Sequence, residues 1–489
     1  MMKFESGKLS RRAMMGVAGL ALSSDSVPRA FAADGPPISP LMQTLSAYMA
    51  SAGAKALPAE VAERAKQHIL DTLAAMISGA ELPPGRFDLK FARTYASPAG
   101  CTIAASNLLA GPIEAAMING LLAHSDETDD THPRSNSHPG APVVSAALAT
   151  SEHFGVSGVR FLNAVALGYD IGTRFAMTLG KLEYMAATHR STHGLCGNFG
   201  AAAAAGSAAG LNAQQMRWLL SYAAQDASGL ASWGRDIDHI EKAFDFSGMG
   251  ARNGVTAALL VQAGATGVDD VLSGADNFFL AFQPMNPPAM LVDGLGSRFE
   301  IGLTDFKKWT VGSPIQAPLD AMVAIREKTK FTPDQVKSVT VRVAADEATI
   351  VDNRFLPDIC LQHMIAVMLL DGTVSFKSAH DVARMKDAAV LKERAKVNLV
   401  HDASLQKLLP ARVAIVDVAL NDGRVLNQRI EAVRGTAKNP MGHDEIVAKA
   451  TDLIAPVLGN PSCKKLIDAV FALETLPNIA NLRPLLQKA

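Results

Sequence analysis

The chain has 489 residues, of which 48% are apolar and 19% are charged, and its formal net charge at pH 7 is −1. A chain of this length and apolar content can bury a large core and divide into more than one domain. The near balance of charge excludes a polycationic nucleic-acid-binding protein and an acidic tail, so we expect small molecules or copies of the same chain as partners.

The first 32 residues have the pattern of a twin-arginine export signal. Arg11 and Arg12 precede an apolar stretch from Met14 to Leu22, and Ala30-Phe-Ala suits a cleavage site. The apolar stretch is far shorter than the roughly 20 residues that cross a bilayer. The pattern predicts a periplasmic protein with no membrane attachment after the signal is removed. An unstructured arm with chance arginines is the alternative.

Helical patterns dominate residues 38–297. After Pro58, apolar residues recur at three- and four-residue spacing up to Gly79, which is typical of an amphipathic helix. Alanine-rich segments such as 200–210 and 254–264 allow helices to approach closely. An aromatic content of only 6% also favours packed helices over a sandwich of strands.

Strand patterns appear after residue 298. Val339, Val341 and Val343 alternate with polar residues, which is typical of a half-buried strand. A second alternating run ends at Leu420, and Asn421-Asp-Gly-Arg then leads into a third run. Two alternating runs joined by such a turn predict a β-hairpin.

Helical patterns also occur between these strands, at 317–329 and 362–370, and again from residue 443 to 487. We therefore predict a mainly α protein with an inserted α+β domain. In this prediction, residues 38–297 and 438–489 form one large helical domain, and residues 298–437 form the smaller domain.

The acidic segment His124-Ser-Asp-Glu-Thr-Asp-Asp-Thr-His-Pro-Arg-Ser-Asn-Ser-His-Pro-Gly140 resembles the acidic His-Pro-Gly signature of the MmgE/PrpD family. The resemblance covers essentially the whole chain after the export signal. Further agreement lies at Gly168-Tyr-Asp, Gly197-Asn-Phe-Gly, Ala251-Arg-Asn-Gly, Pro318-Leu-Asp-Ala, Met368-Leu-Leu-Asp-Gly and Lys438-Asn-Pro-Met.

This resemblance implies a lyase that uses no metal or organic cofactor. It implies dehydration, hydration or decarboxylation of a small polycarboxylate such as 2-methylcitrate. It also implies a homodimer, and a smaller lid domain inserted in a helical domain that both chain ends build. Such reactions need cationic groups that hold carboxylates and a group that moves a proton.

The segment 124–140 carries the first candidate side chains. The resemblance places Glu127, Thr131 and His138 at active-site positions, with Asp130 beside them as a substrate-binding residue. Glu127 stands where many relatives carry aspartate. A loop crowded with titratable groups is costly unless it serves a site. Two alternatives remain open: the acids cap the following helix, or Asp130, His132 and His138 bind a metal.

Two further segments supply an imidazole and an ammonium group. Ser191 stands where relatives often carry histidine, and His193 could supply the missing imidazole from a shifted position or could be a buried hydrogen-bonding residue. Lys242 resembles the family's carboxylate-binding lysine, although its spacing to Arg252 is one residue longer than usual. A surface ion pair is the alternative for Lys242.

Two later positions are expected to contact substrate but depart from the family pattern. Gln316 occupies a position often held by histidine, and a carboxamide cannot exchange protons near neutral pH. His363 lies near a position where relatives often carry an aromatic hydroxyl. It either faces the cleft from the lid or is a satisfied helix histidine.

These segments lead to one mechanistic hypothesis. His138 or His193 moves the proton with Glu127 nearby, while Lys242, Thr131 and the backbone amides near Gly194 hold substrate carboxylates. The departures noted above keep two other functions open. One is an isomerase or another reaction on the same scaffold, and the other is a non-catalytic periplasmic carboxylate-binding protein.

Overall fold

A computed structural model describes residues 37–488, and the chain from Ile38 onward forms one compact unit. The predicted export signal, residues 1–32, lies outside the described residues. Among the described helices, none combines the length and the apolar character needed to cross a membrane. The described chain is mainly helical, with a four-stranded mixed sheet in its C-terminal part and a short two-stranded pair earlier.

The α-helices of the first part are α1 (Pro40–Ala52), α2 (Ala59–Gly79), α3 (Pro83–Ala92), α4 (Pro112–Ala123), α5 (Gly140–Phe154), α6 (Gly158–Leu179), α7 (Lys181–Thr188), α8 (Thr192–Ala209), α9 (Ala213–Gln225), α10 (Ile240–Ala243), α11 (Met249–Gln262) and α12 (Phe278–Phe282). The later ones are α13 (Ser313–Lys328), α14 (Ala345–Val351), α15 (Leu361–Asp371), α16 (Phe376–Ala379), α17 (Ala388–Arg394), α18 (Ala403–Gln406), α19 (His443–Leu458), α20 (Asn460–Phe471) and α21 (Arg483–Leu486). The strands are β1 (Cys101–Thr102), β2 (Leu109–Ala110), β3 (Val336–Ala344), β4 (Val397–Asp402), β5 (Ala414–Leu420) and β6 (Val425–Ile430).

Helix α2 follows the predicted pattern closely. Pro58 immediately precedes it, and its apolar side chains from Val61 to Ile77 are buried. The helix ends at Gly79, as predicted. A Cβ atom at that position would lie 2.1 Å from the carbonyl oxygen of Leu122 in α4. The close approach of α2 and α4 therefore excludes any side chain at position 79.

Small residues also determine how the alanine-rich helix α8 packs. Residues 192–208 of α8 are all buried. A Cβ atom on Gly200 would lie 2.9 Å from the carbonyl oxygen of Gly168 in α6, and the ring of Phe199 stacks on that of Phe175 with 3.7 Å between centroids. The predicted close approach of alanine-rich helices is confirmed for α6 and α8.

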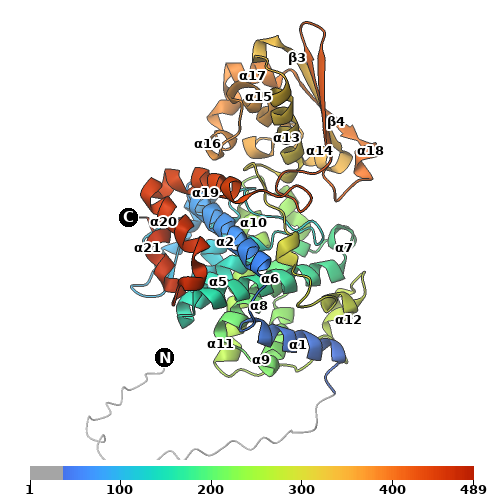
Figure 1. The fold of residues 1–489 in the computed structure, drawn as a ribbon. Helices are drawn as coiled ribbons and strands as arrows, with labels where there is room; N and C mark the ends of the chain where they lie inside the picture. The colour runs from blue at the N-terminus through green and yellow to red at the C-terminus, as the bar shows by residue number, and fades with distance from the viewer. Residues whose placement is uncertain (1–36, 489) are drawn as a thin grey trace, which may run out of the picture. The chain divides into compact units, whose positions relative to one another are not determined.

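The two ends of the described chain share one hydrophobic cluster. Figure 1 shows α19 and α20, drawn in red, beside α2, drawn in blue, and both helices contact α2. The cluster joins Ile69 of α2 with Leu453 of α19 and Leu466 of α20. The predicted return of helical structure near the C-terminus is confirmed.

A second hydrophobic cluster lies within residues 309–433. It contains a sheet with the strand order β4-β3-β5-β6, in which only β3 and β4 are parallel. The predicted hairpin is confirmed as β5 and β6, with Ala414 opposite Ile430. The buried faces of these strands pack against α13 and α15, which contribute Ile315 and Ile365 to this cluster.

Candidate active site

The candidate site is built on the loop between α4 and α5, residues 124–139. After Ala123 the Asp-, Ser- and Pro-rich sequence leaves the helix, because its side chains compete for backbone hydrogen bonds. Most polar side chains of the loop are buried and need partners. Asp126 accepts the backbone N–H of Thr128 at 3.0 Å, and the Thr128 carbonyl oxygen accepts from Lys449 Nζ of α19 at 2.9 Å. The C-terminal helix therefore helps to fix the loop.

Two ammonium groups converge on Glu127. Lys242 Nζ of α10 forms an ion pair with Glu127 Oε1, and Lys307 Nζ lies 3.5 Å from Glu127 Oε2. Lys307 also lies 3.6 Å from Asp129 Oδ1 and is only 1% exposed. Burial alone would raise the pKa of Glu127, but Lys242 and Lys307 outweigh it and hold the pKa well below its usual value. Glu127 is therefore a carboxylate.

His138 lies on the other side of Asp129. Its Nδ1 is 3.4 Å from Asp129 Oδ1 and 2.7 Å from the carbonyl oxygen of Asp130. A carbonyl oxygen can only accept, so Nδ1 carries the hydrogen and Nε2 keeps its lone pair. Burial lowers the pKa of His138 more than Asp129 raises it, so the imidazole is neutral near pH 7. We call Glu127, Asp129, His138, Lys242 and Lys307 the site cluster.

The ring of Phe246 lies close to both His138 and Lys242, which were predicted from separate segments of the sequence. Its centroid lies 5.5 Å from the centroid of His138 and 5.2 Å from Lys242 Nζ. His193 stacks on the same ring at 3.9 Å, and Trp233 meets it edge-on at 4.6 Å. The structure therefore brings His138, His193, Lys242 and Glu127 together. Burial, followed by the neighbouring His138 and Lys242, holds the pKa of His193 well below its usual value.

A π-helical turn, Phe244–Gly248, connects α10 to α11. A π turn accommodates one extra residue within a helix, and such turns are frequent at functional sites. It explains why the sequence between Lys242 and Arg252 is one residue longer than the family spacing. The turn also carries Phe246, whose ring lies at the centre of the aromatic contacts.

The two predicted substrate-binding residues of the loop are Asp130 and Thr131, and the side chain of Asp130 is buried in the scaffold. The carboxylate of Asp130 accepts from the Tyr169 hydroxyl at 2.5 Å and the Gly140 N–H at 3.0 Å, and it pairs with His68 Nδ1 at 2.8 Å. Asp130 acts on the site through its carbonyl oxygen, which fixes the tautomer of His138. Thr131 is partly exposed, and its backbone pairs with Asp305.

The three other predicted substrate-binding residues lie outside the site cluster. Ser191 caps α8, accepting the Gly194 N–H at 3.2 Å while its hydroxyl bonds Asp245. Gln316 uses its whole carboxamide on backbone groups, with Nε2 donating to the Trp309 carbonyl at 2.7 Å. His363 is fully buried on α15, where burial and nearby arginines lower its pKa to about 4.

Sequence reasoning missed several residues that border the site. Lys307 lies far along the chain from the acidic loop. The signal that could have identified it is its place in the Lys-Lys-Trp segment, which leads to the predicted site residue Gln316. Asp129 and His124 form an ion pair of 2.9 Å between Oδ2 and Nδ1. His239 Nδ1 lies 4.0 Å from Glu127 Oε1.

Part of this arrangement could hold a cation. His124, Asp129 and His138 offer ligand atoms that all lie within 4.8 Å of one another. Two contacts oppose metal binding in this geometry. His138 Nδ1 carries a hydrogen towards the Asp130 carbonyl oxygen, and the ammonium group of Lys307 already lies beside Asp129. The donor set therefore suits carboxylate binding and proton transfer better than a metal.

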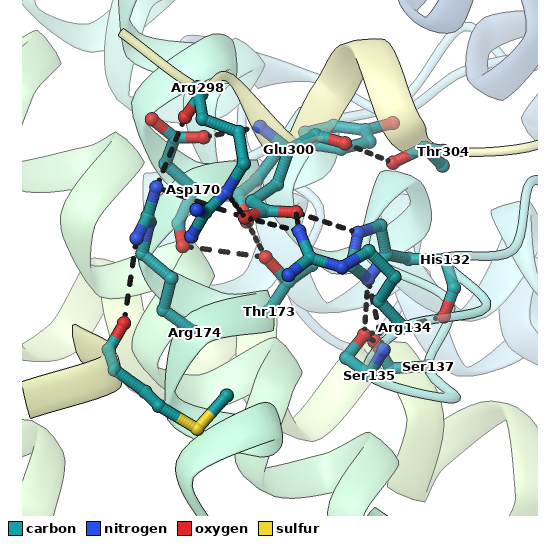
Figure 2. A network of polar contacts seen from close by, with 12 residues as sticks. His132, Arg134, Ser135, Ser137, Asp170, Thr173, Arg174, Arg298, Glu300 and Thr304 are labelled. Atoms are coloured by element: carbon teal, nitrogen blue, oxygen red, sulfur yellow. Dashed lines mark hydrogen bonds and ion pairs between the residues drawn. The ribbon is translucent and has the colours of Figure 1, made fainter. Parts of the chain in front are cut away.

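A buried network around Glu300 anchors the far end of the loop, as Figure 2 shows. Glu300 is fully buried and accepts from Arg134 at 2.7 Å and from Arg298 at 2.9 Å. His132 Nε2 lies 3.2 Å from Glu300, and its Nδ1 lies 2.7 Å from the Ser135 hydroxyl. His132 therefore belongs to this network, and the metal trio suggested by the sequence is not brought together.

Comparison with known proteins identifies the family to which this chain belongs. Residues 43–290 match the MmgE/PrpD N-terminal domain, and residues 309–475 match the MmgE/PrpD C-terminal domain. A cis-aconitate decarboxylase from Aspergillus terreus (strain NIH 2624 / FGSC A1156) is 25% identical over 468 residues, which cover 88% of this chain and 92% of that protein. The cis-aconitate decarboxylase of Homo sapiens is 25% identical over 454 residues, which cover 87% and 90%.

The enzyme of the same name from Mus musculus is 25% identical over 459 residues, covering 87% of this chain and 89% of that protein. The matches run through both parts of the described chain. The N-terminal match includes Glu127, Asp129, His138 and Lys242, whereas Lys307 lies between the two matched ranges. The chain therefore belongs to the MmgE/PrpD family and is a lyase of that family.

Proposed function

We propose that the protein is a cofactor-independent lyase that dehydrates or decarboxylates a small polycarboxylate. The observation that carries this proposal is that two ammonium groups, the buried Lys307 and the partly exposed Lys242, lie in one cluster with a neutral imidazole, His138, that has Nε2 available. Ammonium groups bind and polarise carboxylates, and an imidazole with a pKa near or below neutrality can take a proton.

The site cluster supports two related reactions. In a dehydration, His138 Nε2 takes a proton from the carbon beside a carboxylate, and the electron pair left behind forms the carbon–carbon double bond. The hydroxyl on the next carbon accepts that proton from the imidazolium and leaves as water. In a decarboxylation, the bond to a carboxylate breaks, carbon dioxide leaves, and the electron pair on carbon takes a proton from the imidazolium that His138 forms by accepting a proton from solvent. Asp129, 3.4 Å from His138 Nδ1, stabilises that imidazolium in both cases.

The relatives named cis-aconitate decarboxylase support cis-aconitate as a first candidate substrate. The family assignment equally supports citrate and 2-methylcitrate. The test is to incubate purified protein with each acid and to follow products by mass spectrometry. A product lighter than the acid by the mass of carbon dioxide would indicate decarboxylation, and a product lighter by the mass of water would indicate dehydration.

A binding protein without catalysis is the second candidate. It is favoured by Ser191 and Gln316, which stand where relatives often carry histidine and which are committed to the scaffold. Binding of the acids in calorimetry without any product, under conditions in which the protein is folded, would support this candidate and contradict the lyase proposal.

We further propose that residues 298–437 act as a lid over the site. Two contacts support this role: Lys307 reaches Glu127, and His380 Nε2 lies 2.9 Å from Asp126 Oδ2. Closure over a substrate would exclude water and strengthen both contacts.

We also propose that the protein is exported to the periplasm by the twin-arginine route, which fractionation of cells would test. We propose a homodimer as its oligomeric state, which light scattering of the purified protein would test.

A further inference from the structure

His239 is a buried histidine beside the site cluster, on the segment that leads into α10. Its Nδ1 lies 4.0 Å from Glu127 Oε1, and its ring centroid lies 5.2 Å from that of His124. The residue is 8% exposed. Nε2 is buried and has no hydrogen-bond partner among the described residues. A buried polar atom left unpaired costs free energy, so such an atom requires an explanation.

The backbone of His239 adds a second, independent observation. Its φ of 61° and ψ of 19° lie in the left-handed region, which is unfavourable for residues with a side chain. Glycine would adopt this conformation without strain. The sequence nevertheless keeps an imidazole here, and residues held in strained conformations concentrate at functional sites.

The charges around His239 determine which form of the ring is present. Glu127, Asp126, His124 and Lys242 are the charged or titratable groups that act on it. Burial, together with Lys242, lowers the pKa of His239 to about 3. The ring is therefore neutral at ordinary pH and offers one N–H donor. Nδ1 lies 4.0 Å from Glu127 Oε1, too far for a hydrogen bond, and has no other partner among the described residues, so the hydrogen can lie on Nε2. A neutral donor beside an ammonium group suits a carboxylate oxygen.

We propose that His239 is a further substrate-binding residue whose Nε2–H donates to an oxygen of the carboxylate held by Lys242. This inference rests on the proposed function, because it requires a carboxylate substrate at the site cluster. The substrate carboxylate is then the partner of the strained, unpaired imidazole, and this partner is present only in the complex. His239 would then tighten binding and orient the substrate carboxylate towards His138.

The test uses His239→Gly, which removes the imidazole and relieves the backbone strain together. A matched control is His189→Gly, because His189 has a φ of 59° and is exposed at the end of α7. Both variants should melt at or above the temperature of the unmodified protein. His189→Gly should retain full activity. His239→Gly should raise KM by about tenfold or more and leave kcat within about threefold.

Binding of propane-1,2,3-tricarboxylate, measured by calorimetry, separates this inference from the proposed function. If the unmodified protein binds this tricarboxylate and His239→Gly binds it about tenfold more weakly, the inference is supported. Equal binding by a folded His239→Gly would overturn the inference and leave the lyase proposal intact. If the unmodified protein neither binds nor converts any polycarboxylate, the proposed function and this inference both fail. His239→Asn, which also tolerates φ above zero and keeps an N–H donor, should recover part of the affinity.

Discussion

Replacing His380 by glutamine removes an imidazolium from a buried ion pair that reaches the active-site loop. His380 follows α16, and its Nε2 lies 2.9 Å from Asp126 Oδ2 while Nδ1 lies 2.8 Å from the Phe376 carbonyl oxygen. Both nitrogens face acceptors, so the doubly protonated ring fits this position. Asp126 directly precedes Glu127, and the pair therefore links residues 298–437 to the site cluster.

The size of the effect follows from the pKa of His380. Burial would lower it, but Asp126 and then Asp358 outweigh burial and raise the pKa from 6.5 to about 9. At about 1.4 kcal/mol per pH unit, this rise corresponds to about 3 kcal/mol of stability. Because the pKa is raised on folding, the contribution is fully present below pH 6.5 and is lost as pH rises through 9.

Thermal unfolding at several pH values tests this expectation. With an unfolding entropy of about 2 cal/mol/K per residue over roughly 450 residues, 3 kcal/mol corresponds to about 3 °C in melting temperature. His380→Gln should lower the melting temperature by about this amount at pH 6, and by less than about 1 °C at pH 10. A matched control is His401→Gln, because His401 is 44% exposed and lies 3.7 Å from Asp352. A His380→Gln difference that is independent of pH, or no larger than that of the control, would refute the reasoning.

Three further expectations concern the scaffold and the charge of the site. Glu300→Gln leaves three arginines and an imidazole without their buried carboxylate, and it should destabilise the protein by about 3 kcal/mol or more in denaturant unfolding. Gly140→Ala places a Cβ atom 2.7 Å from the Tyr169 hydroxyl and should lower the melting temperature, whereas Gly302→Ala meets no atom within 4 Å and should not. The two lysines of the site cluster are already paired with carboxylates. A polyanionic ligand therefore adds negative charge that these lysines do not balance. Calorimetry in buffers of different ionisation enthalpy should therefore show proton uptake on binding, and a binding enthalpy that is independent of the buffer would contradict this.

Local patterns in the sequence predicted several elements of the fold. The apolar spacing of α2 and the Asn-Asp-Gly-Arg turn between β5 and β6 act through neighbouring residues, so they could be interpreted without coordinates. Strand β4 was not predicted. Only Val397, Leu399 and Asp402 of β4 are even partly covered, and its parallel pairing with β3 depends on a segment far away in the sequence.

The site was predictable in part for the same reason. Glu127 and His138 lie on one acidic loop, and Lys242 carries the family resemblance. His193 was predicted only as an imidazole at a position shifted from the family pattern. The role of Lys307 depends on a tertiary contact with that loop, which no local pattern encodes. Ser191 was predicted only as a substrate-binding residue, and its role as the N-cap of α8 was not predicted. A serine that precedes an alanine-rich helix is nevertheless typical of an N-cap.

Proton transfer by His138 is central to the proposed reaction, and one kinetic comparison tests it directly. His138→Gln keeps a side-chain N–H donor that can reach the Asp130 carbonyl oxygen but cannot exchange a proton. For the acid that the purified protein converts, kcat/KM of this variant should fall by about a hundredfold or more, with the melting temperature unchanged. A folded His138→Gln enzyme that keeps kcat/KM within about threefold of the unmodified protein would contradict the assignment.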